Sequence, residues 1–304
     1  ATIWTGRPVF RVPFLFFAGF VLLFVIGGVS GVMTAAVPLD WQLTDTYFVV
    51  AHLHYVLIGI NVFPVVGGIY FWFPKFTGRM MSERLGRITF WLMFVGFNLG
   101  FFPMHIAGLL GMPRRIYTYG ADMGWTTVNL LTSIGSFIFA LGIAVFVVDV
   151  LYSRKRGPIA GNNPWDAPTL EWTVPSPPPP YNFAVVPTIA SRHPLWEGRM
   201  QGEGGDAGEA PRSRLADGYI LDQGREALGT TALEAAPYVI LKMPEDSYAP
   251  FWLGLMAALF FAGLALHAWY FAGLALLLAA ATIVVWLWPE RRLMQREPEP
   301  VARH

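Results

Sequence analysis

Long apolar stretches constrain the fold of this chain more than any other feature. An α-helix needs roughly 20 predominantly apolar residues to cross the hydrocarbon core of a bilayer, and six segments approach that length. Charged residues make up only 13% of the chain, against about a quarter in soluble domains. We therefore predict an all-α integral membrane protein, a helical bundle with about six transmembrane helices. The six segments are residues 14–37, 47–73, 90–110, 128–152, 251–267 and 270–288.

The last two apolar segments run together with almost no polar interruption. A single helix over residues 251–288 would be roughly 55 Å long at about 1.5 Å per residue, which is too long for one crossing. We therefore predict a tight hairpin around His267. Trp269 and Tyr270 suit its turn, because their rings favour the membrane–water interface.

Basic residues mark alternate connections between the apolar segments. Connections rich in Lys and Arg face the cytoplasm under the positive-inside rule. On the opposite side, Arg114 and Arg115 break this pattern, and such a pair needs an anionic partner. The basic residues assigned to the cytoplasmic side are Arg7, Arg11, Lys75, Arg79, Arg84, Arg87, Arg154, Lys155, Arg156, Arg291 and Arg292.

A long polar segment separates the fourth and fifth apolar segments. Its proline-rich start favours an extended, polyproline-like path along the cytoplasmic surface. Residues 201–210 are rich in glycine and charge and are predicted to be disordered, and a short helix is expected around residues 224–236. The predicted divisions are a four-helix part at 1–156, an extramembrane Pro/Gly-rich segment at 157–247, a transmembrane hairpin at 248–290 and a cytoplasmic tail at 291–304.

Charge and cysteine content narrow the possible functions. The net charge is +1, so the chain has no electrostatic footprint of nucleic-acid binding. It has no cysteine, which excludes disulfides and thiolate metal sites.

Two histidines lie two residues apart in the second apolar segment. Ionisable side chains at membrane depth are costly and usually mark a site. Two positions along an α-helix correspond to a rotation of about 200°, so His52 and His54 point to nearly opposite sides. They cannot bind the same metal, and one helix would serve a separate centre on each flank. The alternative is a pair of histidines hydrogen-bonded to neighbouring helices.

The motifs around this pair resemble subunit I of haem-copper cytochrome c oxidases, with His52 and His54 in its tenth transmembrane helix. The resemblance covers roughly the first 180 residues, and the motifs occur in the family's order. They are DTYFVVAHLHYV at 45–56, WFPKFTG at 72–78, FFPMH at 101–105, GMPRR at 111–115, NPW at 163–165 and LEWTVPSPPP at 170–179.

The resemblance implies a role for each of the two histidines. It makes His52 the axial ligand of the high-spin haem, where oxygen is reduced, and therefore a catalytic residue. It makes His54 one of two axial ligands of the low-spin haem. The implied cofactors are two haems, expected to be of the haem A type, and copper with ligands outside this chain. A bis-histidine iron suits electron transfer, whereas a single histidine leaves a position open for oxygen.

The resemblance also assigns charged residues on the outer side. Arg114 and Arg115 would bind haem propionates, because a guanidinium matches carboxylate geometry, and Asp40 would contact a propionate of the high-spin haem. Asp45 would help to bind magnesium, but Thr44 stands where the family has histidine and is a poorer ligand. A role for Asp45 as the N-cap of the following helix is equally compatible with the sequence.

The remaining histidines carry less information. His105 follows a proline in an apolar segment, and a structural, hydrogen-bonded role is favoured. His193, His267 and His304 are interpreted as loop, turn and tail residues.

Several family residues are missing from this chain. The three copper-binding histidines and the second axial histidine of the low-spin haem have no counterpart. The resemblance therefore predicts a C-terminal portion of subunit I, helices nine to twelve, with a two-helix extension as in long or I–III fused bacterial forms. The expected partners are the N-terminal part of subunit I, oxidase subunits II and III, cytochrome c, oxygen and the lipid bilayer.

The expected function is part of a terminal oxidase in the bacterial inner membrane. It would reduce oxygen to water with electrons from cytochrome c and pump protons. A quinol oxidase of the same superfamily shares the haem-binding helix and stays open. A nitric oxide reductase relative fits the GMPRR motif and the proline-rich tail less well. From other classes, a non-catalytic haem-binding module and, on composition alone, a membrane transporter remain.

Overall fold

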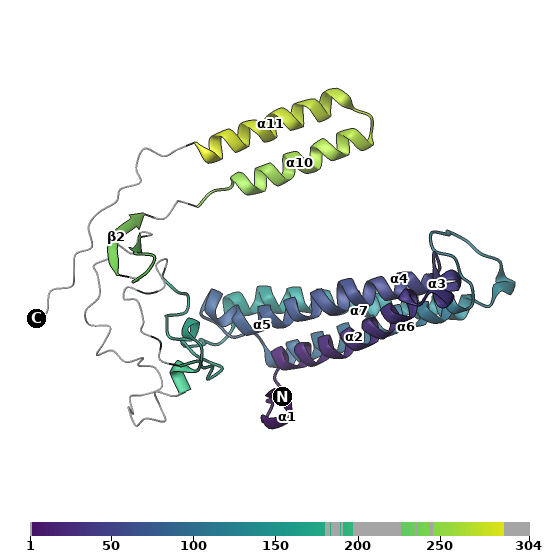
Figure 1. The fold of residues 1–304 in the computed structure, drawn as a ribbon, viewed down its shortest axis with the longest axis horizontal. Coiled ribbons are helices and arrows are strands. Elements are labelled where there is room, and N and C mark those ends of the chain that lie inside the picture. Colours follow the sequence, from purple (N-terminus) through teal and green to yellow (C-terminus); the bar gives the residue numbers. More distant parts are fainter. Residues whose placement is uncertain are drawn as a thin grey trace, which may run out of the picture. The chain divides into compact units, whose positions relative to one another are not determined.

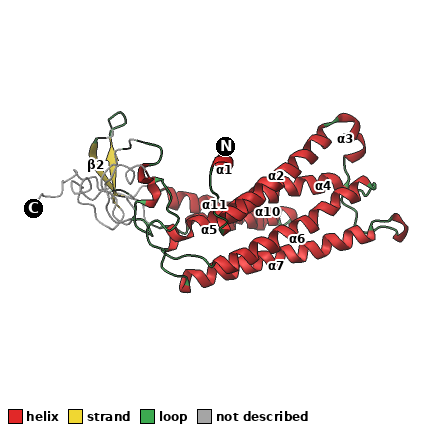
Figure 2. Cartoon of the chain, turned by 90° about the horizontal axis from the view of Figure 1, so that it is seen from below, coloured by secondary structure: helices red, strands yellow, loops and turns green. Residues whose placement is uncertain are grey.

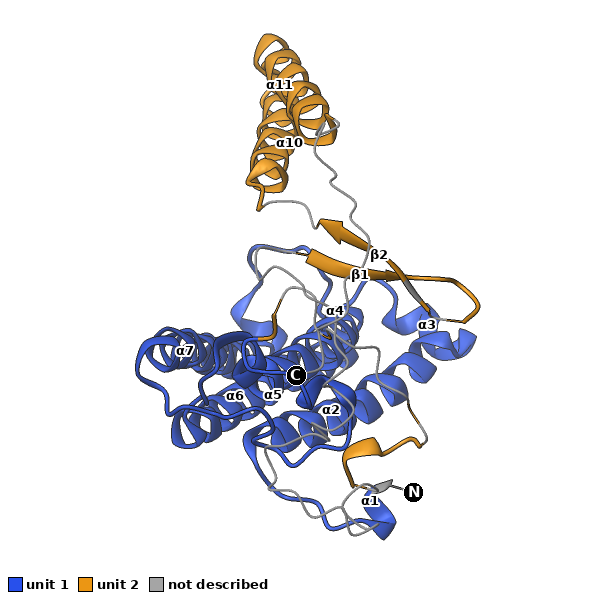
Figure 3. Ribbon diagram, turned by 90° about the vertical axis from the view of Figure 1, so that its left-hand side faces the viewer, with its two compact units in different colours: residues 1–177 blue, residues 178–304 orange. Residues whose placement is uncertain are grey.

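The computed structural model describes residues 2–179, 183, 189, 191–196, 226–234, 236–242 and 246–288. The chain divides into two compact units, residues 1–177 and residues 178–304, which Figure 3 shows in different colours. The predicted disordered stretch 201–210 and the basic pair Arg291 and Arg292 lie outside the described residues.

The first unit is a bundle of long helices (Figures 1 and 2). Four runs of helix are long and apolar enough to cross a membrane. The second run is continuous and consists of three pieces, α4, η1 and α5. The runs are α2 (Val12–Ala35), then α4 (Tyr47–His54), η1 (Tyr55–Val62) and α5 (Phe63–Thr77), then α6 (Glu83–Leu109), then α7 (Thr126–Arg156).

Short elements connect or flank the long helices of this unit. They are α1 (Thr2–Thr5), α3 (Val37–Leu43), η2 (Ala121–Met123) and η3 (Leu170–Trp172). The connection between α5 and α6 is tight because both ends are capped. Gly78 adopts a left-handed conformation with φ 71° after α5, and the Ser82 side chain accepts a 3.2 Å hydrogen bond from Leu85 N at the start of α6. Such caps satisfy backbone groups that the helix leaves without partners.

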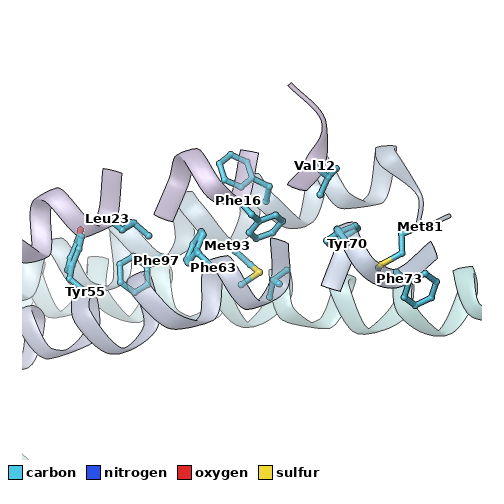
Figure 4. Close-up of a cluster of buried hydrophobic side chains, with 12 residues drawn as sticks. Val12, Phe16, Leu23, Tyr55, Phe63, Tyr70, Phe73, Met81, Met93 and Phe97 are labelled. Carbon is cyan, nitrogen blue, oxygen red and sulfur yellow. The ribbon is translucent and has the colours of Figure 1, made fainter. Parts of the chain in front are cut away.

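Aromatic side chains dominate the core of the bundle (Figure 4). The ring of Phe16 on α2 lies 5.3–5.9 Å from the rings of Phe63, Tyr70 and Phe90. Such packing holds α2 against both α5 and α6. The buried cluster comprises Val12, Phe16, Leu23, Tyr55, Phe63, Val66, Tyr70, Phe73, Met81, Phe90, Met93 and Phe97.

Helices α6 and α7 approach each other closely at glycines. A Cβ atom added to Gly135 would collide with the backbone of residues 99 and 100. Small residues permit such contact where helices pack within a membrane. Position 135 therefore requires glycine.

The first part of the proline-rich segment packs on the end of α5. The indole of Trp165 stacks on Phe71 and donates a 2.7 Å hydrogen bond to the carbonyl of that residue. Lys75 Nζ donates to the carbonyls of Val174 at 2.8 Å and Asn162 at 3.2 Å. These contacts hold residues 162–174 against the end of α5 that carries Lys75.

In the second unit, the prediction of a short helix around residues 224–236 is wrong. The chain instead forms an antiparallel hairpin of β1 (Glu226–Thr230) and β2 (Pro237–Lys242). The strand pairs Glu226 with Lys242, and opposite charges facing each other across strands stabilise the pair. Pro237 cannot continue a helix, and Val239 and Ile240 favour strands. The helical propensity of the alanines and Leu228 is outweighed by this partner strand.

The terminal hairpin has the predicted form. Helix α10 (Ala249–Ala265) and helix α11 (Trp269–Leu287) lie side by side (Figure 1). His267 lies in the turn between them with a left-handed φ of 57°. Helix α11 is long and apolar enough to span a membrane, and α10 is a shorter apolar helix. With the bundle, these helices confirm the prediction of an α-helical multi-pass membrane protein.

Candidate functional site

The run from Tyr47 to Thr77 carries both histidines of the candidate site. Its first residue follows Thr46, whose Oγ1 accepts a 3.2 Å hydrogen bond from Phe48 N and donates to Leu43 O at 2.7 Å. Thr46 is thus the N-cap, and the alternative role of Asp45 as N-cap is wrong. Asp45 lies one residue too early, in a left-handed turn with φ 57°.

His52 faces α2. Its Nδ1 lies 3.1 Å from Gly27 O and 3.1 Å from Ser30 Oγ. Because a carbonyl oxygen only accepts, Nδ1 carries the proton and the lone pair of the ring is on Nε2. A Cβ atom at Gly31 would come within 2.9 Å of His52 Cε1, so only glycine there lets the ring lie this close to α2.

His54 faces α6. Its ring stacks on Phe101 with a centroid distance of 4.3 Å and an interplanar angle of 16°. Its Nδ1 lies 2.7 Å from Val50 O, one turn back on its own helix. The same argument as for His52 places the proton on Nδ1 and the lone pair on Nε2.

The two rings therefore contact different helices, as the two-residue spacing predicts. Within the part of the chain that the structure describes, no hydrogen bond involves Nε2 of His52 or His54. A histidine whose Nδ1–H is held by a carbonyl while Nε2 is unprotonated has the form that binds metals. Among these same residues, no group of three or more His, Asp or Glu side chains could hold a metal ion. The arrangement suits two centres that each take one ligand from this helix.

The helix changes its winding directly after His54. Residues Tyr55–Val62 form a π-helix, a conformation that is rare and frequent at functional sites. Sequence reasoning missed this segment. One local signal was present, because Pro64 has no N–H to donate to Ile60 O and so cannot close an α-helical turn there.

Tyr55 fixes the beginning of the π-helix against α6. Its side chain is fully buried, and its hydroxyl donates a 2.8 Å hydrogen bond to Asn98 Oδ1. The ring also lies 4.9 Å from that of Phe97. The contact positions the backbone immediately next to His54.

Two loops meet at the end of the bundle that holds Asp45 and Arg114. Thr46 and Pro113 form an isolated antiparallel bridge, and Arg114 N donates a 2.9 Å hydrogen bond to Asp45 O. The Arg114 guanidinium lies 4.0 Å from the Asp45 carboxylate, whose side chain is 77% exposed. An ion pair this exposed contributes little to stability.

The other charged residues of this end are placed less tightly. Arg115 is exposed and has a left-handed φ of 66°. Asp40 lies on α3 and is partly buried. Neither residue forms an ion pair with any other described residue. The structure thus brings Asp45 and Arg114 together and leaves Asp40 and Arg115 without a charged partner in the described part.

His105 on α6 is buried next to the start of α4. Its Nδ1 lies 3.2 Å from Phe102 O, and its ring meets Phe48 edge-on at 4.9 Å. Its Nε2 is buried and has no hydrogen-bond partner among the described residues. The favoured structural role accounts for Nδ1 and leaves Nε2 unexplained.

Sequence reasoning missed two buried polar residues of the bundle. Ser30 is 4% exposed and contacts His52, and Asp149 on α7 is fully buried. An acidic residue in an apolar segment was a visible signal for Asp149. A serine in a helix gives no comparable signal, since its partner lies on another helix.

Known proteins resemble this chain over most of its length. Residues 1–138 match the family described as "Cytochrome C and Quinol oxidase polypeptide I". Cytochrome c oxidase subunit 1 of Alkalihalophilus pseudofirmus is 40% identical over 266 residues, which cover 87% of this chain and 38% of that protein. The subunit 1 of Bacillus subtilis is 46% identical over 202 residues, which cover 66% of this chain and 32% of that protein.

A third relative gives a similar result. The "Probable cytochrome c oxidase subunit 1-beta" of Nocardia farcinica is 48% identical over 198 residues, which cover 64% of this chain and 34% of that protein. The chain thus spans about a third of the length of these curated relatives. A solved haem-copper terminal oxidase dimer is 19% identical, with a TM-score of 0.44 over 49% of this chain and 27% of that one.

Proposed function

Because this chain belongs to the subunit I family of haem-copper oxidases, we propose that it forms the haem-binding C-terminal portion of the catalytic subunit of a terminal respiratory oxidase. The whole enzyme reduces oxygen to water and pumps protons across a bacterial inner membrane. Its other parts are the N-terminal portion of subunit I, which supplies the copper ligands, and subunits II and III.

The observation that carries this proposal is the paired geometry of His52 and His54. Each ring has Nδ1 held by a carbonyl and Nε2 without a hydrogen bond in the described part of the chain. His52 on the α2 side would hold the high-spin haem, and His54 on the α6 side would hold the low-spin haem. When bound, the haem irons supply electron transfer and oxygen binding. The imidazoles would hold the two groups on opposite flanks of one helix.

Arg114, Arg115 and Asp40 are the proposed partners of the haem propionates. Guanidinium groups bind carboxylates in a bidentate geometry and remain charged at any physiological pH. Arg115 suits this role because it has no ion-pair partner among the described residues. Arg114 is only weakly engaged by Asp45 at 4.0 Å, so a propionate would compete well for it.

A magnesium ion at Asp45 would have one protein ligand from this chain. A carboxylate oxygen suits magnesium, but Thr44 replaces the family's histidine, and magnesium needs near-octahedral coordination. In the described residues, Asp45 belongs to no group of three or more acidic or histidine side chains that could hold a metal ion. The remaining ligands would have to come from water and from a partner subunit.

Cytochrome c is the proposed electron donor, because the similar proteins are named cytochrome c oxidases. One measurement, the copper content of subunit II, distinguishes a quinol oxidase from a cytochrome c oxidase. A cytochrome c oxidase carries copper in its subunit II, so purified complex with copper only in subunit I would favour quinol.

The haem assignment is tested in the assembled enzyme with His52→Ala and His54→Ala. His52→Ala should abolish oxygen reduction while the low-spin haem spectrum survives, and His54→Ala should remove the low-spin spectrum. The reason is that the two rings lie on opposite flanks. If both variants lose the same single haem, the assignment is wrong. His193→Ala is a matched control, since that histidine lies outside the helices and should change neither spectrum.

A further inference from the structure

Ser30 forms a closed triangle of polar atoms with His52 and Gly27. Its Oγ lies 3.0 Å from Gly27 O and 3.1 Å from His52 Nδ1, and that nitrogen lies 3.1 Å from Gly27 O. Ser30 is 4% exposed. All three atoms are therefore within hydrogen-bond distance of one another in a site shielded from water.

The available protons determine how this triangle is bonded. Gly27 O can only accept, and Ser30 has a single hydroxyl proton, which it donates to Gly27 O. The Ser30 oxygen then accepts from the Nδ1–H of His52. The imidazole proton is shared between two acceptors, and the carbonyl is shared between two side-chain donors.

We infer that Ser30 is a positioning residue that weakens the hydrogen bond from His52 Nδ1 to Gly27 and thereby limits the electron donation of Nε2 to its iron. This inference rests on the proposed function of His52 as a haem ligand. A stronger hydrogen bond at Nδ1 raises the basicity of a metal-binding histidine. By occupying both Nδ1–H and Gly27 O, the hydroxyl keeps that bond from reaching full strength.

The surrounding contacts keep the His52 ring next to Ser30 and Gly27. A Cβ atom at Gly31 would lie 2.9 Å from the ring, and one at Gly27 would lie 3.2 Å from Tyr55 Cβ. The His52 ring is thus held directly against α2. A substitution at Ser30 therefore changes the hydrogen bond from His52 Nδ1 to Gly27 O without a shift of α2.

Thr34 is a matched control for Ser30, because its hydroxyl makes the same bond within α2. It lies one helical turn after Ser30, and its Oγ1 donates to Gly31 O at 2.8 Å. Ser30 makes the same type of bond to the carbonyl three residues back, which is the ordinary role of a hydroxyl within a helix. The contact with His52 distinguishes Ser30 from Thr34.

The test compares Ser30→Ala with Thr34→Ala in the complete, membrane-extracted oxidase that contains this chain. The iron–histidine stretching frequency is measured by resonance Raman spectroscopy on the reduced high-spin haem, and its midpoint potential by redox titration. Ser30→Ala should shift the stretching frequency upward and the midpoint potential downward, because Nδ1–H then bonds to Gly27 O alone. Thr34→Ala should leave both unchanged.

The outcomes separate this inference from the proposed function. An unchanged or lowered frequency in Ser30→Ala overturns the inference, and so does an equal shift in Thr34→Ala, which would indicate a general effect on α2. If the iron–histidine band persists unaltered in His52→Ala, the ligand assignment itself fails, whatever the serine variant does. Haem content per complex is measured in each variant, so that loss of haem is not mistaken for a shift.

Discussion

The hydroxyl of Tyr70 donates a 3.0 Å hydrogen bond to Oδ2 of Asp149, which joins α5 to α7 through a fully buried carboxylate. The other oxygen of Asp149 accepts from Ser153 Oγ at 2.8 Å and from Ser82 N at 3.3 Å. One acidic side chain thus connects α5, the start of α6 and α7. A buried carboxylate is tolerated because three donors replace its water.

Asp149→Ala should destabilise the bundle strongly. The substitution takes the Asp149 acceptor away from the buried Tyr70 hydroxyl and the partly buried Ser82 amide, and each such loss costs on the order of 1–3 kcal/mol when the group stays buried. Tyr70→Phe removes a single donor and should cost about 1 kcal/mol. Thermal unfolding of the purified complex measures both effects. Ser133→Ala is the control, since that exposed serine on α7 bonds only to its own helix. A loss of stability in Ser133→Ala equal to that in Asp149→Ala would contradict a stabilising role for the buried carboxylate.

If Arg115 binds a haem propionate as proposed, Arg115→Gln should lower the midpoint potential of that haem. A nearby cation disfavours the more positive oxidised state, so its removal favours oxidation. Redox titration of the assembled enzyme measures the shift. Asp45→Asn is the comparison at the same end of the bundle: it breaks the exposed 4.0 Å pair with Arg114 and removes a negative charge, so it should not lower the potential. An unchanged potential in Arg115→Gln would count against propionate contact.

The terminal hairpin should place both of its ends on the same side of the membrane. The chain has no cysteine, so Ser247→Cys, Ala268→Cys and Arg292→Cys each introduce a label site that is unique within this chain. Impermeant thiol reagents on intact and inverted vesicles should label positions 247 and 292 from the cytoplasmic side and 268 from the other. Labelling of 247 and 292 from opposite sides would mean a single crossing and would exclude two membrane-spanning passes for α10 and α11.

Deleting the chain after Pro244 should leave the haem spectrum intact. Helices α10 and α11 contain no acidic residue and no histidine, and they belong to the second compact unit. We expect less assembled complex in the membrane but an unchanged absorbance spectrum per complex. Loss of either haem band from the assembled fraction would assign the hairpin a direct role in haem binding.

Residues 1–304 expressed alone should show no oxygen turnover. The described part of the chain has no cluster of three His, Asp or Glu side chains that could hold copper, and the resemblance to the family predicts that the second axial histidine of the low-spin haem lies outside this chain. Oxygen consumption with reduced cytochrome c measures the activity. The complete complex serves as the positive control, and significant turnover by the isolated chain would refute the need for the missing part of subunit I.

The sequence by itself determined the membrane-spanning helices, the turn at His267 and the opposite orientation of His52 and His54. These features depend on local periodicity and on the length of apolar runs, which any single helix expresses without its neighbours. The motifs also identified the family before any contact was known.

Only the tertiary structure decided which groups surround those residues. The partners of His52 on α2, the tie between Tyr70 and Asp149, and the pairing of β1 with β2 join positions that are distant along the chain. The N-cap at Thr46 was also set this way, because the bridge to Pro113 fixes where α4 begins. Local propensity could not reveal these choices, since each depends on the free energy of packing one segment against another.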